Sequence, residues 1–258
     1  MNQGLAMFDL TGKVAITVGG SGGLGTEVSL GLARAGADVI PMSRNLENNQ
    51  RLAEQIEALG RRSLGLSVDI LDRQQVEQAV AQIMEKFGHI DILVNAAGAL
   101  AKKPFLEYTE EDWDRVMDTN LKGMFIVCQV VGKIMVEQKA GKIINFASMG
   151  SFLGITRSSA YCASKGGVVQ LTKVLAGEWG PYGVNVNAIA PGWFKTQLNQ
   201  HFLGQPEVQA KICGDTPLRR YGKAEDLVGA VVFLASPASD FVTGATLAVD
   251  GGYLSLAL

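Results

Sequence analysis

The stretch that decides the fold is VAITVGGSGGLGTEVSLGLARAGADVI, residues Val14–Ile40. An apolar run is followed by a glycine-rich turn, a segment with helical spacing and a second apolar run, which predicts strand, turn, helix and strand. In the turn, Gly19, Gly23 and Gly25 are spaced G-x-x-x-G-x-G. Glycines let the backbone approach a pyrophosphate closely, and the amide groups that begin the helix then meet its charge. An ordinary tight turn also uses glycines, but the position between strand and helix favours a dinucleotide-binding turn.

The rest of the chain repeats this alternation of apolar runs with helical segments. The expected strands are Val14–Val18, Asp38–Met42, Ser63–Ser67, Ile90–Val94, Lys142–Ala147, Val184–Ile189 and Thr246–Val249. The expected helices are Leu24–Ala35, Leu46–Leu59, Arg73–Phe87, Glu110–Gln138, Ala160–Gly180 and Ala224–Ala235. Most runs are short and rich in Val and Ile, as strands buried in a parallel sheet are. The pattern predicts an α/β fold, with a single Rossmann-type doubly wound parallel sheet of about seven strands and helices on both faces.

No linker, low-complexity stretch or shift in charge divides the chain. Residues 1–258 are therefore expected to form a single NAD(P)-binding domain. The stretch 193–217 follows the sixth strand with mixed signals, and a long stretch of this kind in a compact domain is usually functional. We expect a substrate flap there.

Composition excludes several classes of function. The net charge of −2 gives no basic field for nucleic acid, and no apolar run reaches the roughly 18 residues of a membrane span. The N-terminus lacks the pattern of a secretory signal. Cys128, Cys162 and Cys213 are far apart and odd in number, which suits reduced thiols in the cytoplasm. His89 and His201 stand alone, so no metal site is expected.

The residues at the end of the second strand bear on the choice of cofactor. An NAD site usually has Asp or Glu here, to accept hydrogen bonds from the adenosine ribose. This chain has Ser43 followed by Arg44. A carboxylate would repel a 2′-phosphate, whereas a guanidinium can pair with it, although a solvated loop arginine is the alternative. The sequence therefore favours NADP, with NAD possible.

A candidate catalytic set lies in the second half of the chain. Tyr161 and Lys165 are four apart on an expected helix, so phenol and ammonium share one face. A phenol of ordinary pKa, near 10, is a poor base at neutral pH unless a nearby cation favours the phenolate. Ser148 ends the strand K-I-I-N-F-A-S, and its hydroxyl can hold a substrate oxygen while Tyr161 exchanges the proton.

In combination these features resemble the short-chain dehydrogenase/reductase family over nearly the whole chain. The family's signposts occur in order: the glycine turn, Asp69, N-A-A-G at Asn95–Gly98, Asn120 in D-T-N-L-K-G, Ser148, Tyr161 with Lys165, Pro191-Gly192, and V-D-G-G-Y at Val249–Tyr253. The resemblance implies that Asn120, Ser148, Tyr161 and Lys165 are catalytic. It further implies that Asn120 holds a helix distortion and a water that links Lys165 to solvent. The residues expected to bind the cofactor are Gly19, Ser21, Gly23, Leu24, Gly25, Ser43, Arg44, Asp69, Ile70, Asn95, Ala96, Gly98, Tyr161, Lys165, Pro191, Gly192 and Thr196.

Two positions depart from the family pattern. Val18 stands where a threonine is usual, with Thr17 one residue earlier, and Ala96 replaces the second asparagine of N-N-A-G. The hydroxyl that would join the turn to this segment is therefore missing or displaced. Because the two segments normally touch, we expect the two changes to compensate by apolar packing.

Within the family the chain is most similar to sugar-acid dehydrogenases of the gluconate 5-dehydrogenase and 2-deoxygluconate 3-dehydrogenase type. The similar segments are KKPFLEYTEEDWDRVMDTNLKG, PGWFKTQLN and TPLRRYGKAEDLVGAVVFLAS. This similarity implies a hydride transfer between NADP and a secondary alcohol or ketone of a gluconate-like acid. The expected substrate residues are Lys102, Ser148, Tyr161 and Trp193; further candidates are Lys103, Arg157 and Lys195 for the carboxylate, and Phe194 and His201 in the flap.

Other functions remain open at this point. A 3-oxoacyl thioester reductase or a broad ketone reductase shares most of these residues. A catalytically silent NADP-binding sensor is the alternative from another class, against which the complete catalytic set argues. The helices Glu110–Gln138 and Ala160–Gly180 carry apolar residues on several faces, which predicts burial against other subunits and, by resemblance, a homotetramer.

Overall fold

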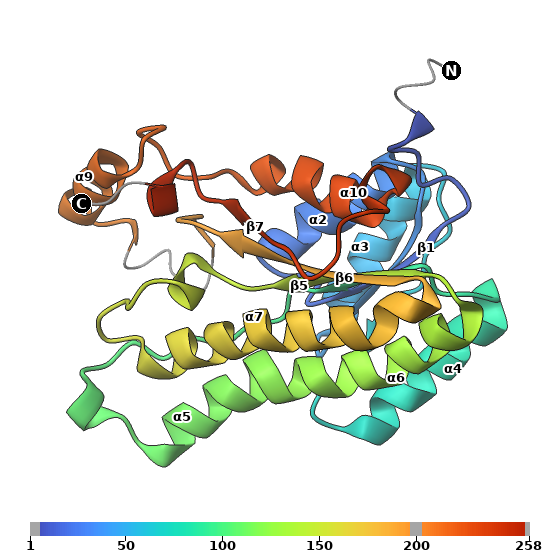
Figure 1. Cartoon of the computed structure of the whole chain (residues 1–258), viewed down its shortest axis with the longest axis horizontal. Helices are drawn as coiled ribbons and strands as arrows, with labels where there is room; N and C mark the ends of the chain where they lie inside the picture. The colour runs from blue at the N-terminus through green and yellow to red at the C-terminus, as the bar shows by residue number, and fades with distance from the viewer. Residues whose placement is uncertain (1–5, 197–202, 256–258) are drawn as a thin grey trace.

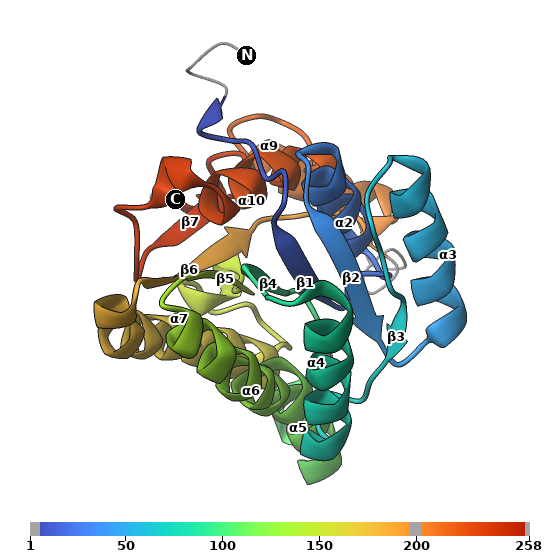
Figure 2. The same ribbon diagram turned by 90° about the vertical axis from the view of Figure 1, so that its right-hand side faces the viewer.

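The computed structural model describes residues 6–196 and 203–255. Its sheet has seven strands, all parallel, in the order β3-β2-β1-β4-β5-β6-β7 (Figure 2). The strands are β1 (Val14–Val18), β2 (Asp38–Ser43), β3 (Leu66–Ser67), β4 (Ile92–Asn95), β5 (Gly141–Phe146), β6 (Val184–Pro191) and β7 (Thr246–Val249). This is the doubly wound sheet that the alternation of the sequence predicts.

Helices cover both faces of the sheet (Figure 1). The helices of eight or more residues are α2 (Leu24–Arg34), α3 (Leu46–Ala58), α4 (Arg73–Phe87), α5 (Glu110–Met117), α6 (Gly123–Gln138), α7 (Ser159–Trp179), α9 (Pro206–Asp215) and α10 (Val228–Ala235). One apolar cluster joins the sheet to α4, α6 and α7, and a second joins its other face to α2, α3 and α10. Strands β1 and β4 are buried along their whole length, because both of their faces are covered.

Apart from shifts of one or two residues at the ends of several elements, the structure differs from the sequence prediction in four places. Strand β3 is shorter than Ser63–Ser67, because Ser63 forms only an isolated bridge with Val39. The expected helix Glu110–Gln138 contains a π-helical segment, η2 (Asp118–Lys122), between α5 and α6. The last expected helix begins as a 3-10 turn, η5 (Ala224–Leu227), before α10. Helix α9 lies within the stretch that was expected to be a flap.

The continuous helix Glu110–Gln138 is also long and apolar enough to pass as a candidate membrane span by length and composition, and it is the one such helix in the described part of the chain. Half of its most apolar window is buried within the chain. Core helices of soluble proteins pass the same test. The sequence predicted this helix but no candidate membrane span, because charged and polar residues interrupt its apolar runs.

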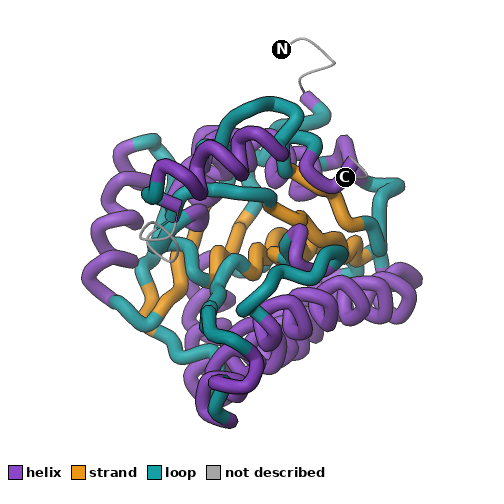
Figure 3. The backbone as a smooth tube through the Cα atoms, turned by 90° about the vertical axis from the view of Figure 1, so that its left-hand side faces the viewer, coloured by secondary structure: helices purple, strands orange, loops and turns teal. Residues whose placement is uncertain are grey.

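The strand order places the site. Strands β1 and β4 are neighbours in the sheet, and the chain leaves their carboxyl ends toward opposite faces. An open α/β sheet has a crevice at such a switch point. Figure 3 views this edge, where loops lie in front of the strands.

Candidate active site

The glycine turn packs directly against the segment that follows β4. Gly19 has a φ of +73°, and a Cβ added there would lie 2.7 Å from the backbone nitrogen of Ala97. A side chain at this position would therefore separate the two loops. Within the described residues no side chain caps the first turn of α2, whose N-cap is Gly23. The amide of Gly25 donates to the carbonyl of Gly22 at 2.8 Å, and the neighbouring amides of Leu24 and Thr26 can meet an anion.

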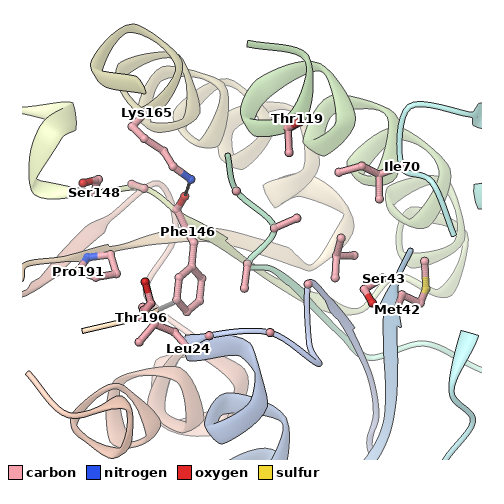
Figure 4. A pocket seen from close by; sticks show the side chains of 18 of the residues that line it. Leu24, Met42, Ser43, Ile70, Thr119, Phe146, Ser148, Lys165, Pro191 and Thr196 are labelled. Carbon is pink, nitrogen blue, oxygen red and sulfur yellow. Dashed lines mark hydrogen bonds between the residues drawn. The ribbon is translucent and has the colours of Figure 1, made fainter. Parts of the chain in front are cut away.

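A cleft of about 490 Å³ opens at the switch point (Figure 4). It brings together most of the residues expected to bind the cofactor: Gly19, Gly23, Leu24, Ser43, Arg44, Asp69, Ile70, Ala96, Gly98, Tyr161, Lys165, Pro191, Gly192 and Thr196. Ser148 lines the same cleft. Residues from the first strand to the segment after the sixth strand therefore meet in one crevice.

Three of the expected cofactor or catalytic residues lie behind the surface of this cleft. Gly25 is buried in the first turn of α2. Asn95 and Asn120 line a separate cavity of about 10 Å³ that also touches Lys165. A polar space of this size holds about one water molecule.

Ser21 also lies outside the set that lines the cleft, but it contacts a residue that does. Its hydroxyl is 3.0 Å from the hydroxyl of Ser43 and donates to Oδ1 of Asn49 at 2.5 Å. Asn49 is completely buried on α3. Sequence reasoning missed Asn49, and the available signal was a polar residue on the apolar face of an expected helix.

The catalytic candidates are close together at the inner end of the cleft. Nζ of Lys165 donates to the backbone carbonyl of Phe146 at 2.6 Å and lies 5.9 Å from the centre of the Tyr161 ring. Burial lowers the pKa of Lys165 from 10.5 to about 8. Ser148 lies two residues beyond the end of β5 and caps the short 3-10 helix Met149–Ser151, where its Oγ accepts from the amide of Gly150 at 3.1 Å.

The phenol of Tyr161 does not have the lowered pKa that a neighbouring cation was expected to produce. Burial raises the pKa of Tyr161, a hydrogen bond with Ser148 acts in the opposite direction, and Cys162 raises the pKa further. Lys165 donates to Phe146 rather than to the phenol, so burial dominates. In this state the phenol carries its proton at neutral pH.

The expected helix distortion at Asn120 is present as the π-helical segment η2. Oδ1 of Asn120 accepts from the amide of Ala99 at 2.7 Å, and its Nδ2 donates to the carbonyl of Ala99 and to the hydroxyl of Ser164, both at 3.0 Å. The side chain is therefore joined to the loop after β4 and to the helix of Tyr161. A π-helical turn often occurs at a functional site.

Asn95 belongs to a buried polar ladder rather than to the cleft. Its Nδ2 donates to Oδ1 of Asn145 at 2.9 Å, and Nδ2 of Asn145 donates to the hydroxyl of Thr172 at 3.0 Å. The ladder ties β4, β5 and α7 together. Sequence reasoning missed Asn145, because its partner is 50 residues away in the chain.

The two departures from the family pattern do not pack against one another. Val18 belongs to the apolar cluster under α4, α6 and α7, whereas Ala96 packs against the cluster on the other face. The expected compensation is therefore wrong. A backbone hydrogen bond from Ala96 to the carbonyl of Val18, 2.9 Å long, connects the two segments, and the hydroxyl of Thr17 pairs with Ser29 at 2.8 Å.

The cationic candidates for a substrate carboxylate lie outside the main cleft. Lys103 is paired with Asp112, and Nζ of Lys195 lies 4.9 Å from the centre of the Tyr221 ring. Burial lowers the pKa of Lys102, and repulsion by Arg157 lowers it further. Arg157 has a φ of +65°, and its carbonyl accepts from the amide of Lys103 at 2.9 Å. Lys102 and Arg157 thus form a neighbouring pair of like charges.

The segment after β6 contributes Phe194 to the cleft where Trp193 was expected. Trp193 instead lines a second cavity of about 230 Å³ and contacts Tyr253 edge to face, with 6.3 Å between ring centres. Phe194 is 4% exposed and lines both cavities. His201 lies outside the described residues.

Several further residues line the cleft that sequence reasoning did not include. Most contribute apolar side chains or backbone: Val18, Gly22, Met42, Val68, Leu71, Ala97, Thr119, Phe146 and Ala147. Residues of this kind carry no chemical motif. For most of them the only signal was a position near the carboxyl end of an expected strand, and Thr119 lies in an expected helix.

Comparisons with known proteins agree with this geometry. A family model described as enoyl-(acyl carrier protein) reductase matches residues 19–254. The chain is 44% identical over 252 residues to 2-dehydro-3-deoxy-D-gluconate 5-dehydrogenase of Escherichia coli (strain K12), covering 97% of this chain and 99% of that one. It is 40% identical over 246 residues to gluconate 5-dehydrogenase of Gluconobacter oxydans (strain 621H), covering 95% and 96% of the two chains.

A solved structure gives the same result. The crystal structure of a gluconate 5-dehydrogenase from Burkholderia cenocepacia J2315, in complex with NADP and tartrate, superimposes with a TM-score of 0.96. The two sequences are 38% identical, and the match covers 98% of this chain and 100% of that one. Sequence, sheet order and cleft lead to one conclusion. The chain belongs to the short-chain dehydrogenase/reductase family.

Proposed function

We propose that this protein is an NADP-dependent oxidoreductase that transfers a hydride between the nicotinamide and a secondary alcohol or ketone of a gluconate-like sugar acid. The observation that carries the proposal is the meeting of Tyr161, Lys165 and Ser148 in the cleft at the switch point. The relatives named above act on, or are named for, gluconate derivatives. The structurally similar gluconate 5-dehydrogenase was solved with NADP and tartrate, itself a sugar-derived diacid.

The residues of the cleft fit NADP. The glycine turn and the first turn of α2, which no described side chain caps, suit a pyrophosphate. Strand β2 ends in Ser43 and Arg44 without a carboxylate, and the exposed guanidinium of Arg44 suits a 2′-phosphate. Asp69 and Ile70 would flank the adenine, while Pro191, Gly192 and Thr196 would hold the nicotinamide amide.

The catalytic roles of Ser148, Tyr161 and Lys165 follow from which of these side chains carries a proton that it can donate. The chemistry that the bound nicotinamide supplies is hydride transfer. In the direction of reduction, Ser148 donates a hydrogen bond to the carbonyl oxygen, and Tyr161 gives its proton to the same oxygen as the carbon accepts the hydride. The proton on Tyr161 in the free chain suits this direction. In oxidation the phenolate must form first, and the ammonium of Lys165 stabilises it.

We further propose that Asn120 completes a path for the proton. The small cavity touched by Asn120 and Lys165 has room for about one water molecule. Such a water would return a proton to Tyr161 through Lys165. Asn120 is held by three hydrogen bonds, so its role is to position the loop, the helix and that water.

The carboxylate of the substrate is assigned to Lys102 and Arg157. Two neighbouring cations repel one another, and an anion that binds between them relieves that repulsion. Residues 193–217 are proposed to form the substrate flap, with Phe194 as its apolar contact to the cleft.

Two alternatives compete with this proposal. A 3-oxoacyl thioester reductase shares an acyl thioester substrate with the enoyl reductase of the family model's description, although an enoyl reductase acts on a carbon–carbon double bond. A broad ketone reductase fits the catalytic set. The high identity to gluconate-type dehydrogenases over nearly full length favours the sugar acid. A silent NADP-binding sensor would not need a complete Ser148, Tyr161 and Lys165.

The test is a substrate panel with NADPH. We expect keto-gluconates to be reduced with a kcat/KM about tenfold or more above that of uncharged sugar ketones, because the carboxylate pairs with the cations. In Lys102→Met this preference should shrink through a higher KM with kcat little changed, while Lys133→Met, on the outer part of α6, should keep it. Faster turnover of acyl thioesters would favour the first alternative.

We also propose a homotetramer in the cytoplasm. Phe125 on α6 and Val174 on α7 are about half exposed, at 45% and 53%, whereas several neighbouring apolar residues of these helices are buried. Exposed apolar side chains on such helices support burial by other copies of the chain. Light scattering should give the mass of four chains, and the mass of one chain would refute this assembly.

A further inference from the structure

Asn49 is the one fully buried residue of α3 whose side chain is polar. It occupies the apolar face of the helix beside Leu52 and Ile56, and it lies directly beneath the end of β2. Its Nδ2 donates to the backbone carbonyls of Ser43 at 3.0 Å and of Leu66 at 2.6 Å. A flipped amide would set its oxygen against two carbonyl oxygens, so the orientation of the side chain is fixed.

The fixed amide turns its oxygen toward two serine hydroxyls. Ser21 donates to Oδ1 of Asn49 at 2.5 Å, and Ser43 donates to the same oxygen at 2.8 Å. The two hydroxyls are 3.0 Å from one another, and Ser43 also accepts from the amide of Asn45 at 3.2 Å. Both N–H groups and the oxygen of the Asn49 side-chain amide therefore have hydrogen-bond partners inside the protein.

The number of protons in this cluster limits what it can bind. Each hydroxyl has one proton, and the amide oxygen has none. If both serines donate to Asn49, no proton points into the cleft. If one serine donates to the other, the second still donates to Asn49. A proton can point out of the cluster only when one of its two internal hydrogen bonds is given up, and the buried amide oxygen then keeps a single donor, which is unfavourable at a buried position.

We propose that Asn49, together with Ser21, fixes Ser43 as a hydrogen-bond acceptor, so that Ser43, which lines the cleft, recognises the 2′-hydroxyl of an unphosphorylated adenosine ribose and leaves a 2′-phosphate to Arg44. A ribose hydroxyl can donate to this oxygen, whereas a phosphate brings only acceptors. Asn49 is then a positioning residue that keeps NAD bound competitively with NADP. The inference rests on the proposed function for its nucleotide site and concerns only the choice between the two cofactors.

The direct test measures binding rather than turnover. Isothermal titration calorimetry would compare NADH with NADPH, and 5′-AMP with adenosine 2′,5′-bisphosphate, on the full chain. In Asn49→Leu the two serine protons are free to donate, so the preference for the 2′-phosphorylated ligands should rise about fivefold or more over the parent chain. Asn48→Leu is the matched control, because it makes the same substitution one residue away at an exposed position.

A second variant removes an acceptor without disturbing the buried amide. Ser43→Ala should weaken the binding of NADH and 5′-AMP about threefold or more, while binding of the 2′-phosphorylated ligands changes by less than about twofold. If Ser43 instead donated to the 2′-phosphate, Ser43→Ala would weaken the binding of the 2′-phosphorylated ligands most, which is the opposite change in preference. It also tests the inference if Asn49→Leu does not fold.

Three outcomes overturn the inference. The first is a loss in Ser43→Ala that falls mainly on the 2′-phosphorylated ligands. The second is a preference for the 2′-phosphorylated ligands that is the same in Asn49→Leu as in the control Asn48→Leu. The third is a parent chain that binds none of the four ligands, which would refute the proposed function as well. If the variants bind the ligands normally and the preference between 2′-phosphorylated and unphosphorylated ligands does not change, the inference is refuted and the proposed function is not.

Discussion

At the scale of single residues, the buried charge of Lys165 has an electrostatic cost. Its amine is buried, and this burial lowers the pKa from 10.5 to about 8. The folded chain therefore holds the proton less tightly than the unfolded chain does. A difference of this size corresponds to about 3 kcal/mol of lost stability at neutral pH.

Replacing this lysine should stabilise the free protein. In Lys165→Met the free energy of unfolding at pH 7 should rise by about 2 kcal/mol, because the relieved burial of charge exceeds the lost hydrogen bond to Phe146. Between about pH 8 and 10.5 the unfolded wild-type chain binds more protons than the folded one, so wild-type stability rises with pH. The advantage of the variant should therefore be complete below pH 8 and shrink above it.

Denaturant unfolding across this range of pH measures the effect. Lys173→Met removes an exposed lysine from the same helix and serves as the control. A variant less stable than the parent at pH 7, or an advantage that does not change with pH, would contradict the assigned burial cost.

At the scale of the elements, close approach of helices explains some glycines that the sequence alone does not. Gly31 on α2 faces α10, where an added Cβ would meet the side chain of Val228 well inside van der Waals distance, with its Cγ2 at 2.9 Å. Nothing lies within 4 Å of a Cβ added at Gly229, the next residue along α10. Substitutions at the two positions therefore distinguish the effect of packing from the effect of helix propensity.

Substitution of these two glycines should have effects of opposite sign. Gly31→Ala should destabilise the fold by about 1–3 kcal/mol through overpacking. Gly229→Ala should be neutral or stabilise it by up to about 1 kcal/mol, because alanine is the better helix former. Thermal unfolding of both variants checks this, and equal losses in the two would contradict the contact between α2 and α10.

Local sequence patterns predicted most helices and strands, but not the local structure that depends on contacts between segments distant in the chain. The period of the apolar residues gave β1 and β7 with the observed bounds and α4 without error. The π-helical turn at Asn120 was predicted only by resemblance, since it depends on bonds to Ala99 and Ser164. Helix α9 was missed because its sequence has little amphipathic pattern.

At the scale of the whole molecule, the sheet order brings the predicted motifs to one cleft. The glycine turn, Ser148 and Pro191 are far apart in the chain, but each lies at the carboxyl end of a strand or just beyond it, and Tyr161 on α7 faces the same cleft. Their meeting was therefore predictable once the sheet was taken as parallel. Asn49 and Asn145 were not, because nothing near them in the sequence shows which hydroxyls or amides they contact.

The substrate residues were the least predictable part of the site for the same reason. Trp193 and Phe194 are neighbours in sequence, yet only Phe194 lines the main cleft. Of the cations, Lys103 is paired with Asp112, while Lys102 and Arg157 lie near one another outside the main cleft. Side-chain direction after a strand depends on packing that a sequence does not specify.

The central claim is that Tyr161 is the proton donor for hydride transfer in this cleft. The most direct test mixes NADPH with a keto-gluconate and follows absorbance of the reduced nicotinamide, with the parent chain and with Tyr161→Phe. We predict turnover in the parent, a loss of about a thousandfold or more in the variant, and NADPH affinity within about threefold in both. Comparable turnover in Tyr161→Phe, or a parent chain that binds NADPH tightly but reduces no carbonyl compound, would contradict the account.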